Sequence, residues 1–233
     1  MTRRTTALAA TATVATVLAA PAAALAVTGG PDRKCYTHIP TKGTQPIVVG
    51  MNGGTPGGGF VLAATVPGKG LGSAGSTDGD FDASGNAFAR ITDVFPPSGS
   101  IEPIKGQRVD LSVQDFGAPG FPTSPLGSVL ITNLAIKVAA KPISPRKRRR
   151  VTVSGTPFAH RRVYGFVVKG KSRHVLHRFR IGRGNVCGYA THKAVVAPAH
   201  YRIGRYRLYV NAGKRLNRRK ALRYDFRIFH RYL

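Results

Sequence analysis

The chain has 233 residues, of which 42% are hydrophobic, so it can bury one large or two ordinary cores and is not a disordered chain. Its 36 Lys and Arg against 9 Asp and Glu give a formal net charge of +27. Charge of this size favours an anionic partner or surface and is uninformative about the fold.

Residues 1–26 have the pattern of a secretory signal peptide. Arg3 and Arg4 precede an uncharged stretch of Ala, Val, Thr and Leu, and small residues occupy positions 22–26. A membrane anchor is the alternative, but the stretch is short for a span and is interrupted by Pro21. We predict a secreted or cell-surface protein without a transmembrane span in the mature chain, and both Sec and twin-arginine export remain open.

Residues 27–140 are predicted to form an antiparallel β-sandwich. Short apolar runs alternate with turns rich in Gly, Pro, Ser and Asp, and a helical period is not evident. In the clearest strand Val109, Leu111 and Val113 alternate with polar residues. The region is neutral, with eight basic and eight acidic side chains. The expected strands cover residues 47–49, 60–66, 87–95, 108–116 and 128–138.

Residues 141–150, KPISPRKRRR, combine two prolines with a basic run and are predicted to be a linker. The region from 151 to 233 is predicted to be a second, strongly basic sandwich. From residue 141 onward the chain has 26 Lys and Arg, and Asp225 is its single acid. The expected strands cover residues 150–155, 163–168, 174–181, 189–197, 206–212 and 222–229.

The clearest hairpin in the basic region joins residues 164–168 to residues 174–181 through a Gly-Lys turn. In its second run His177 and Phe179 fall on one face, and Arg178 and Arg180 fall on the other. The last strand, residues 222–229, alternates in the same way. Arginines at alternate positions therefore predict basic stripes on an outer sheet face.

These stripes are the candidate binding site, because guanidinium groups bind phosphate and carboxylate bidentately and tyrosines can stack on bases or sugars. Anionic wall polymers or acidic polysaccharide are the expected partners, and nonspecific nucleic-acid binding is possible. The alternative is that arginine only keeps an exported sandwich soluble. The candidate residues are Arg178, Arg180, Arg202, Arg205, Arg207, Arg218, Arg219 and Lys220.

Cys35 and Cys187 are the two cysteines, and in an oxidising compartment they are a candidate disulfide. Two free thiols or a bond between chains are the alternatives. Asp80, Asp82 and Ser84 have the start of a calcium loop, but position twelve is Ile91, so a polar hairpin turn is favoured over a metal site. We expect no cofactor.

Catalytic residues are not predicted. The basic half contains histidines, but it lacks a Gly-x-Ser-x-Gly elbow, and its single acid leaves few candidates to orient a base. The acids of the first half are dispersed over turns and strand faces. An enzyme is therefore the weaker class.

The order of features Val163-Tyr164, Cys187-Gly188 and residues 204–208 resembles a group of secreted, uncharacterised two-domain Ig-like proteins of high-GC Gram-positive bacteria. Residues 82–88, DASGNAF, resemble a hairpin of bacterial Ig-like repeats. The resemblance implies an all-β fold of two Ig-like antiparallel β-sandwich domains in tandem, and it carries no catalytic residues.

The sequence therefore predicts an exported, non-enzymatic Ig-like protein that binds anionic envelope or extracellular polymers through its basic C-terminal domain. The alternative is a structural or adhesive module that recognises a protein partner. The oligomeric state is left open.

Overall fold

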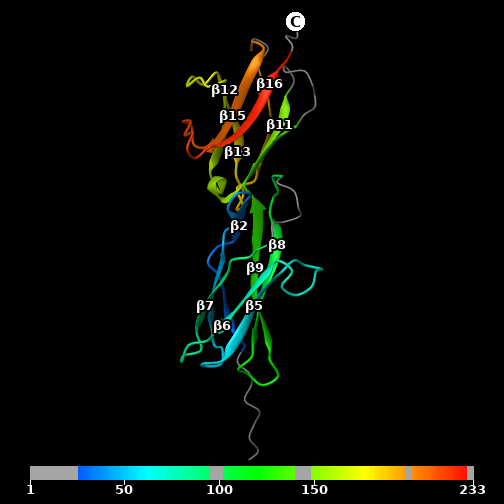
Figure 1. Cartoon of the computed structure of the whole chain (residues 1–233), viewed down its shortest axis with the longest axis vertical. Helices are drawn as coiled ribbons and strands as arrows, with labels where there is room; N and C mark the ends of the chain where they lie inside the picture. Colours follow the sequence, from blue (N-terminus) through cyan, green and yellow to red (C-terminus); the bar gives the residue numbers. More distant parts are fainter. Residues whose placement is uncertain (1–25, 95–101, 140–147, 198–200, 230–233) are drawn as a thin grey trace, which may run out of the picture.

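The computed structural model describes residues 26–94, 102–139, 148–197 and 201–229, which form two β-sandwiches stacked end to end (Figure 1). The predicted signal peptide lies outside the described residues, except for Ala26. Within the described part of the chain, we find no helix with the length and apolar character needed to cross a membrane.

The first sandwich packs a three-stranded sheet against a six-stranded sheet. The smaller sheet has the order β1 (Thr28–Pro31), β4 (Ile47–Asn52) and β7 (Ala87–Ile91). The larger has the order β3 (Gly43–Thr44), β2 (Cys35–Ile39), β9 (Thr123–Asn133), β8 (Gln107–Asp115), β5 (Gly59–Thr65) and β6 (Gly75–Asp80). The strand pairs are antiparallel except for β2 and β9, which run parallel. Both sheets bury their apolar side chains in one core, which includes Ile47, Leu62 and Ile131.

The second sandwich packs a three-stranded sheet against a four-stranded sheet. The smaller sheet has the order β10 (Ala135–Val138), β11 (Arg149–Ser154) and β14 (Ala190–Ala194). The larger has the order β13 (His177–Arg183), β12 (Arg162–Lys169), β15 (Gly204–Ala212) and β16 (Leu222–Ile228). A short 3-10 turn, η1 (Thr156–Phe158), follows β11. Val153, Val167 and Leu208 lie in the core between the sheets.

Both sandwiches have the same strand order. In Ig-like notation, the small sheet holds strands A, B and E, which are β1, β4 and β7 in one sandwich and β10, β11 and β14 in the other. The large sheet holds C′, C, F and G, as β6-β5-β8-β9 and as β13-β12-β15-β16. The predicted fold class, all-β with two Ig-like antiparallel sandwiches, is confirmed.

The boundary between the sandwiches lies earlier than the sequence indicated. Residues 128–138 were expected to be one strand of the first unit, but β9 ends at Asn133 and β10 begins at Ala135. β10 pairs with β11, and its apolar side chains pack against the second core. Thr132 and Asn133 interrupt the apolar run directly before Leu134, but neither is a turn-forming glycine or proline, so the run was predicted as one strand.

The predicted linker, residues 141–150, therefore falls within the second sandwich, between β10 and β11. Arg149 and Arg150 already belong to β11, and residues 140–147 lie outside the described residues. Leu134 alone separates the last strand of the first sandwich from the first strand of the second.

The joint between the sandwiches is also closed by a covalent bond. Cys35 on β2 and Cys187, just before β14, form a disulfide with Cα atoms 5.4 Å apart, so the predicted pairing is confirmed. Beside it, the N–H of Thr156 donates to the hydroxyl of Thr37 at 2.8 Å, and the two hydroxyls lie 2.9 Å apart. The N–H of Leu134 also donates to the carbonyl of His38 on β2 at 2.8 Å, so the disulfide, these hydrogen bonds and the chain connection all hold the first sandwich to the second.

Candidate anion-binding face

The large sheet of the second sandwich has two unlike faces. Its inner face places Val163, Val167, Leu208 and Val210 in the core. The register brings the alternate residues of all four strands to the outer face, where Phe166 of β12 lies between Arg178 of β13 and Tyr209 of β15. The sequence pattern of strands with one apolar side and one basic side therefore produces a continuous outer surface.

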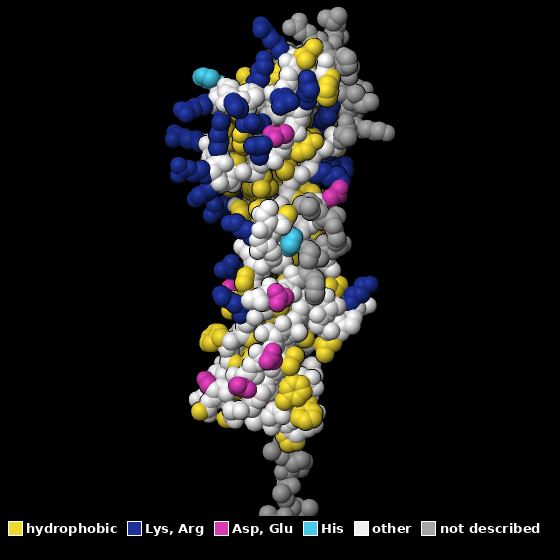
Figure 2. Space-filling view, viewed as in Figure 1, with side chains coloured by type: hydrophobic (Ala, Val, Ile, Leu, Met, Phe, Trp, Pro, Cys, Tyr) yellow, Lys and Arg dark blue, Asp and Glu magenta, His cyan; other side chains and the backbone are white. Residues whose placement is uncertain are grey.

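Arginines lie along the outer face of β13, β15 and β16, and Arg162 at the start of β12 lines a hollow with Tyr164 and Lys214. Arg205 of β15 lies directly opposite Arg227 of β16, and Arg207 lies opposite Asp225. Figure 2 shows that Lys and Arg gather over the second sandwich, whereas most of the visible Asp and Glu lie on the first. We call this surface, together with the loop of residues 213–221, the basic face. Its strand arginines are Arg178, Arg180, Arg205, Arg207, Arg223 and Arg227.

The centre of the basic face is apolar and covered. Tyr164, Phe166, Val168 and Tyr209 form a small buried cluster on this side of the sheet, separate from the main core. Residues 213–221, which connect β15 to β16, lie against the cluster through Leu216 and Ala221. The loop therefore adds a second layer to the sheet and carries its own lysines and arginines above the aromatic centre.

One buried asparagine holds this loop in place. The amide nitrogen of Asn211 donates to the carbonyl oxygens of Ala212, Gly213 and Arg215, at 3.0, 3.4 and 3.1 Å. Its side-chain oxygen accepts the N–H of Asn217 at 3.2 Å. Only 3% of Asn211 is exposed, so its donors and acceptor are all directed into the loop backbone.

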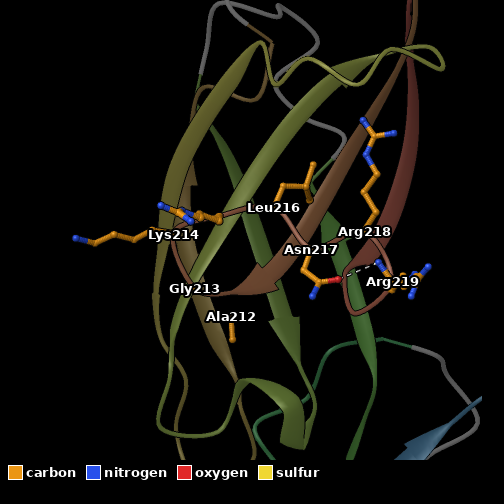
Figure 3. Close-up of a pocket in the computed structure, with 8 residues that line it drawn as sticks. Ala212, Gly213, Lys214, Leu216, Asn217, Arg218 and Arg219 are labelled. Carbon is orange, nitrogen blue, oxygen red and sulfur yellow. Dashed lines mark hydrogen bonds between the residues drawn. The ribbon is translucent and has the colours of Figure 1, made fainter.

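Asn217 also binds the loop backbone through its side chain, because its side-chain oxygen accepts the N–H of Arg219 at 3.2 Å (Figure 3). In the close-up the long side chains of Lys214 and Arg219 point away from the sheet, on opposite sides of the loop. The loop thus has a defined backbone, and its cationic side chains are presented to solvent from fixed positions.

Two of the candidate arginines also support the loop. The guanidinium of Arg218 lies 5.4 Å from the ring centre of Tyr209 and donates to the carbonyl of Ser172 at 2.6 Å. Arg178 donates to the carbonyl of Lys214 at 3.2 Å. Part of the donor capacity of both side chains is therefore used within the protein.

Asp225 lies in the middle of the cations of β15 and β16. Its carboxylate is 2.7 Å from the guanidinium of Arg223 and 3.6 Å from that of Arg207. The hydrogen bond from Arg223 to this carboxylate raises the pKa of Arg223. The single acid of residues 141–233 is thus already neutralised by two arginines of the face.

The structure brings together most of the candidate residues but not all of them. Arg178, Arg180, Arg205 and Arg207 share the sheet face, and Arg218, Arg219 and Lys220 lie in the loop above it. Arg202 lies before β15, where its carbonyl accepts a hydrogen bond from the hydroxyl of Tyr206, an inner-face residue. The strand pairing therefore does not carry Arg202 onto the basic face.

Sequence reasoning left out Arg223, Arg227, Lys171 and Lys214 as site residues. The alternation of β16 already indicated that Arg223 and Arg227 share a face, so these two could have been included. Tyr164 and Tyr209 gave no signal, because β12 and the second half of β15 read as continuous apolar runs from which the outer face is not evident.

The weak calcium candidate serves as a turn. The N–H groups of Asn86 and Ser84 donate to one carboxylate oxygen of Asp82, at 2.9 and 2.8 Å, and hold the pKa of Asp82 below its ordinary value. Asp80 ends β6. Across the described ranges, His, Cys, Asp and Glu do not gather in any group of three that could hold a metal ion.

Comparison with known proteins adds little to this description. No family model and no curated protein matches the sequence. Among solved structures, the tetra-tandem repeat in the extending region of a large adhesion protein matches at 12% identity and a TM-score of 0.30, covering 87% of this chain and 49% of that one. The FN1–FN3 domains of chicken CNTN1 match at 11% identity and a TM-score of 0.27, covering 88% and 66%. Structural similarity at these TM-scores is too low to assign a fold, so the fold assignment rests on the strand order.

Proposed function

We propose that the chain is an exported, non-enzymatic Ig-like binding module whose basic face holds anionic polymers. The observation that carries the proposal is the composition of that face: arginines of β13, β15 and β16 and the cations of the loop surround one acid, which two of the arginines already neutralise. The pattern of residues 1–26 and the Cys35–Cys187 disulfide support export.

The dimensions of the face suit a polymer. β15 has nine residues, which at about 3.3 Å per residue extend over about 30 Å. Cations occur along this whole length, from Lys171 and Arg205 at one end to Arg180 and Lys214 at the other. A linear polyanion can therefore contact several cations at once, and each contact releases counterions from the polymer.

The test is binding of the mature chain, residues 27–233, to defined polyanions across a salt series. Suitable probes are polyphosphate, polygalacturonate and double-stranded DNA. The face variant Arg180→Ser, Lys214→Ser, Arg219→Ser and Lys220→Ser removes four exposed cations whose side chains make no hydrogen bond or ion pair with the described residues. We expect it to weaken binding at least tenfold and to flatten the dependence of affinity on salt, by a slope of about 0.9 for each lost contact with DNA.

The matched control removes the same charge from the first sandwich, through Lys34→Ser, Lys42→Ser, Lys69→Ser and Arg90→Ser. It should keep nearly all of the affinity. Equal losses in both variants would mean that net charge alone is responsible, and binding that is insensitive to salt would favour a shape-specific adhesive module instead.

A further inference from the structure

One part of the basic face forms a surface hollow at the end where β12 turns into β13. Gly170, with a φ of +52°, makes this turn, and its N–H donates to the carbonyl of Arg205 at 2.8 Å. The turn therefore places Lys171 beside the first residues of β15. The hollow is lined by Lys171 from the turn, by Arg205 and Arg207 from β15, and by Arg223, Asp225 and Arg227 from β16.

Two of these arginines are already paired. Arg207 and Arg223 both form ion pairs with the carboxylate of Asp225, so one carboxylate in the hollow is already bound by two guanidinium groups. Three cations remain: Lys171, Arg205 and Arg227. Among the described residues, none of the three forms an ion pair with an acid. The guanidinium of Arg227 packs over the ring of Phe229, 5.1 Å from its centre.

We propose that this hollow is a site for a phosphate monoester, bound by Lys171, Arg205 and Arg227. The inference rests on the proposed function and names the anionic group that the face recognises. A phosphate monoester has three acceptor oxygens and a charge between about −1.5 and −2 at neutral pH. These properties match three cations that line one hollow, whereas a carboxylate has two oxygens and one charge, and two guanidiniums already satisfy the carboxylate of Asp225.

The position of Arg205 directly opposite Arg227 supports the assignment. Like charges that face each other across two antiparallel strands repel, so an oxyanion held between them relieves the repulsion in addition to making hydrogen bonds. Arg150 and Lys193 form a second like-charge pair of this kind, on β11 and β14 of the other sheet. That pair does not line the hollow, which makes it a matched control.

The experiment titrates the mature chain with glycerol phosphate, sulfate and acetate, and follows the side-chain Nε–H resonances of Arg205 and Arg227. We expect glycerol phosphate to shift both resonances and to bind at least tenfold more tightly than acetate, because its third oxygen and second charge allow a further charge-assisted hydrogen bond. Binding should strengthen as the pH rises through about 6, where the phosphate gains its second charge. Acetate and sulfate should show no such step.

Arg205→Ala with Arg227→Ala should abolish these effects, while Arg150→Ala with Lys193→Ala should leave them intact. Equal binding of acetate, or an unchanged phosphate affinity in Arg205→Ala/Arg227→Ala, would overturn the site. If the four-residue face variant lost polyphosphate binding but still bound glycerol phosphate, the hollow would bind phosphate independently of the cations that hold the polymer. Conversely, retention of polyanion binding without a phosphate step would leave the face as a general polyanion surface and remove this site.

Phosphate monoesters occur on soluble molecules and on lipids, and the same variants distinguish these sources. Vesicles of phosphatidylcholine with phosphatidic acid present the group on a membrane, whereas glycerol phosphate presents it free. Binding of free glycerol phosphate through Arg205 and Arg227, without recruitment to the vesicles, would assign the hollow to a soluble or polymer-borne phosphate. Recruitment that depends on Arg205 and Arg227 would assign it to the lipid headgroup.

Discussion

The two sandwiches share one strand order but differ in the side chains on the outer face of the large sheet. The outer positions of β8 in the first sandwich are Asp110, Ser112 and Gln114, and the corresponding strand of the second, β15, has Arg205, Arg207 and Tyr209. The same contrast separates Asp78 and Asp80 of β6 from Arg178 and Arg180 of β13.

This contrast shows that the fold does not require the charge. Alternation of apolar and polar residues is enough to build each large sheet, and the first sandwich achieves it with mixed polar side chains. The arginines of the second sandwich are an additional feature, and their mutual repulsion is a cost that the first sandwich does not carry. A function for the basic face explains why one sandwich has this surface and the other does not.

Removing the covalent joint should have the largest effect on stability. The disulfide spans 152 residues, and in the chain-entropy model its loss costs about 5 kcal/mol before strain is considered. We expect Cys35→Ser with Cys187→Ser to lower the unfolding temperature by several degrees and to separate the unfolding of the two sandwiches. Calorimetry of the oxidised and reduced protein measures this.

Polyanion affinity supplies the control for this variant, because the disulfide lies at the joint and makes no contact with the basic face. The double variant should bind polyphosphate as the original protein does. A double variant that unfolds in one transition at the original temperature would contradict the expectation.

Equivalent cavity-creating substitutions in the two cores should show whether charge repulsion destabilises only the second sandwich. Leu62 and Leu208 are both fully buried, so Leu62→Ala and Leu208→Ala should each lower the free energy of unfolding by about 2–5 kcal/mol. Added salt should recover part of the loss in Leu208→Ala, since screening weakens repulsion among the arginines of the second sandwich. It should have little effect on Leu62→Ala. Denaturant titration at low and high salt tests this, and an equal response in both variants would contradict it.

Alternation along strands was the most informative feature of the sequence. It located β8, β15 and β16 and assigned Arg178 and Arg180 to one face, whereas β5 and β12 were located as continuous apolar runs. The patterns missed β1, β2, β3 and β6; the sequence of β6, GSTDGD, lacks apolar residues, and the strand lies at a sheet edge.

The apolar centre of the basic face was also beyond the sequence. The burial of Tyr164, Phe166 and Tyr209 depends on a loop that returns over the sheet, and the position of that loop is set by the hydrogen bonds of Asn211. A single asparagine in an apolar strand gives no local sign of such a role. The boundary at Leu134 was missed because the polar pair Thr132 and Asn133, which is buried at the end of β9, was taken as part of one continuous strand.

Neutralising the acid of the basic face should raise its affinity for polyanions. Asp225→Asn frees Arg207 and Arg223 and removes one repulsive charge, so we expect severalfold tighter binding of polyphosphate. Stability should change little, since the ion pair is exposed.

Asp110→Asn in the first sandwich is the matched control, because Asp110 is likewise paired with an exposed arginine, Arg108, at 2.7 Å on the outer face of β8. It should leave polyanion affinity unchanged. An equal gain in both variants would mean that net charge, and not the local release of Arg207 and Arg223, sets the affinity.

The smallest effect concerns a late-titrating tyrosine in each sandwich. Burial raises the pKa of Tyr201, which stacks on Tyr206 at 5.2 Å, to about 12. In the first sandwich burial, followed by the hydrogen bond to Asp32, raises the pKa of Tyr36 still further above its ordinary value. Because the folded state favours the neutral phenol, the stability from Tyr201 is complete below the unfolded pKa of about 10 and is lost as the pH rises through about 12.

Burial also raises the pKa of Tyr206, so ultraviolet titration should show Tyr36, Tyr201 and Tyr206 ionising after the rest. Tyr201→Phe and Tyr36→Phe should each remove one of these late ionisations. The two substitutions distinguish the sandwiches, since Tyr36→Phe also removes a hydrogen bond to Asp32 and Tyr201→Phe leaves the stacked ring in place. Above pH 10 the Tyr201→Phe protein should lose less stability than the original. Ionisation of every tyrosine near pH 10 in the folded protein would show that the environments of Tyr36 and Tyr201 are more open to water than their burial indicates.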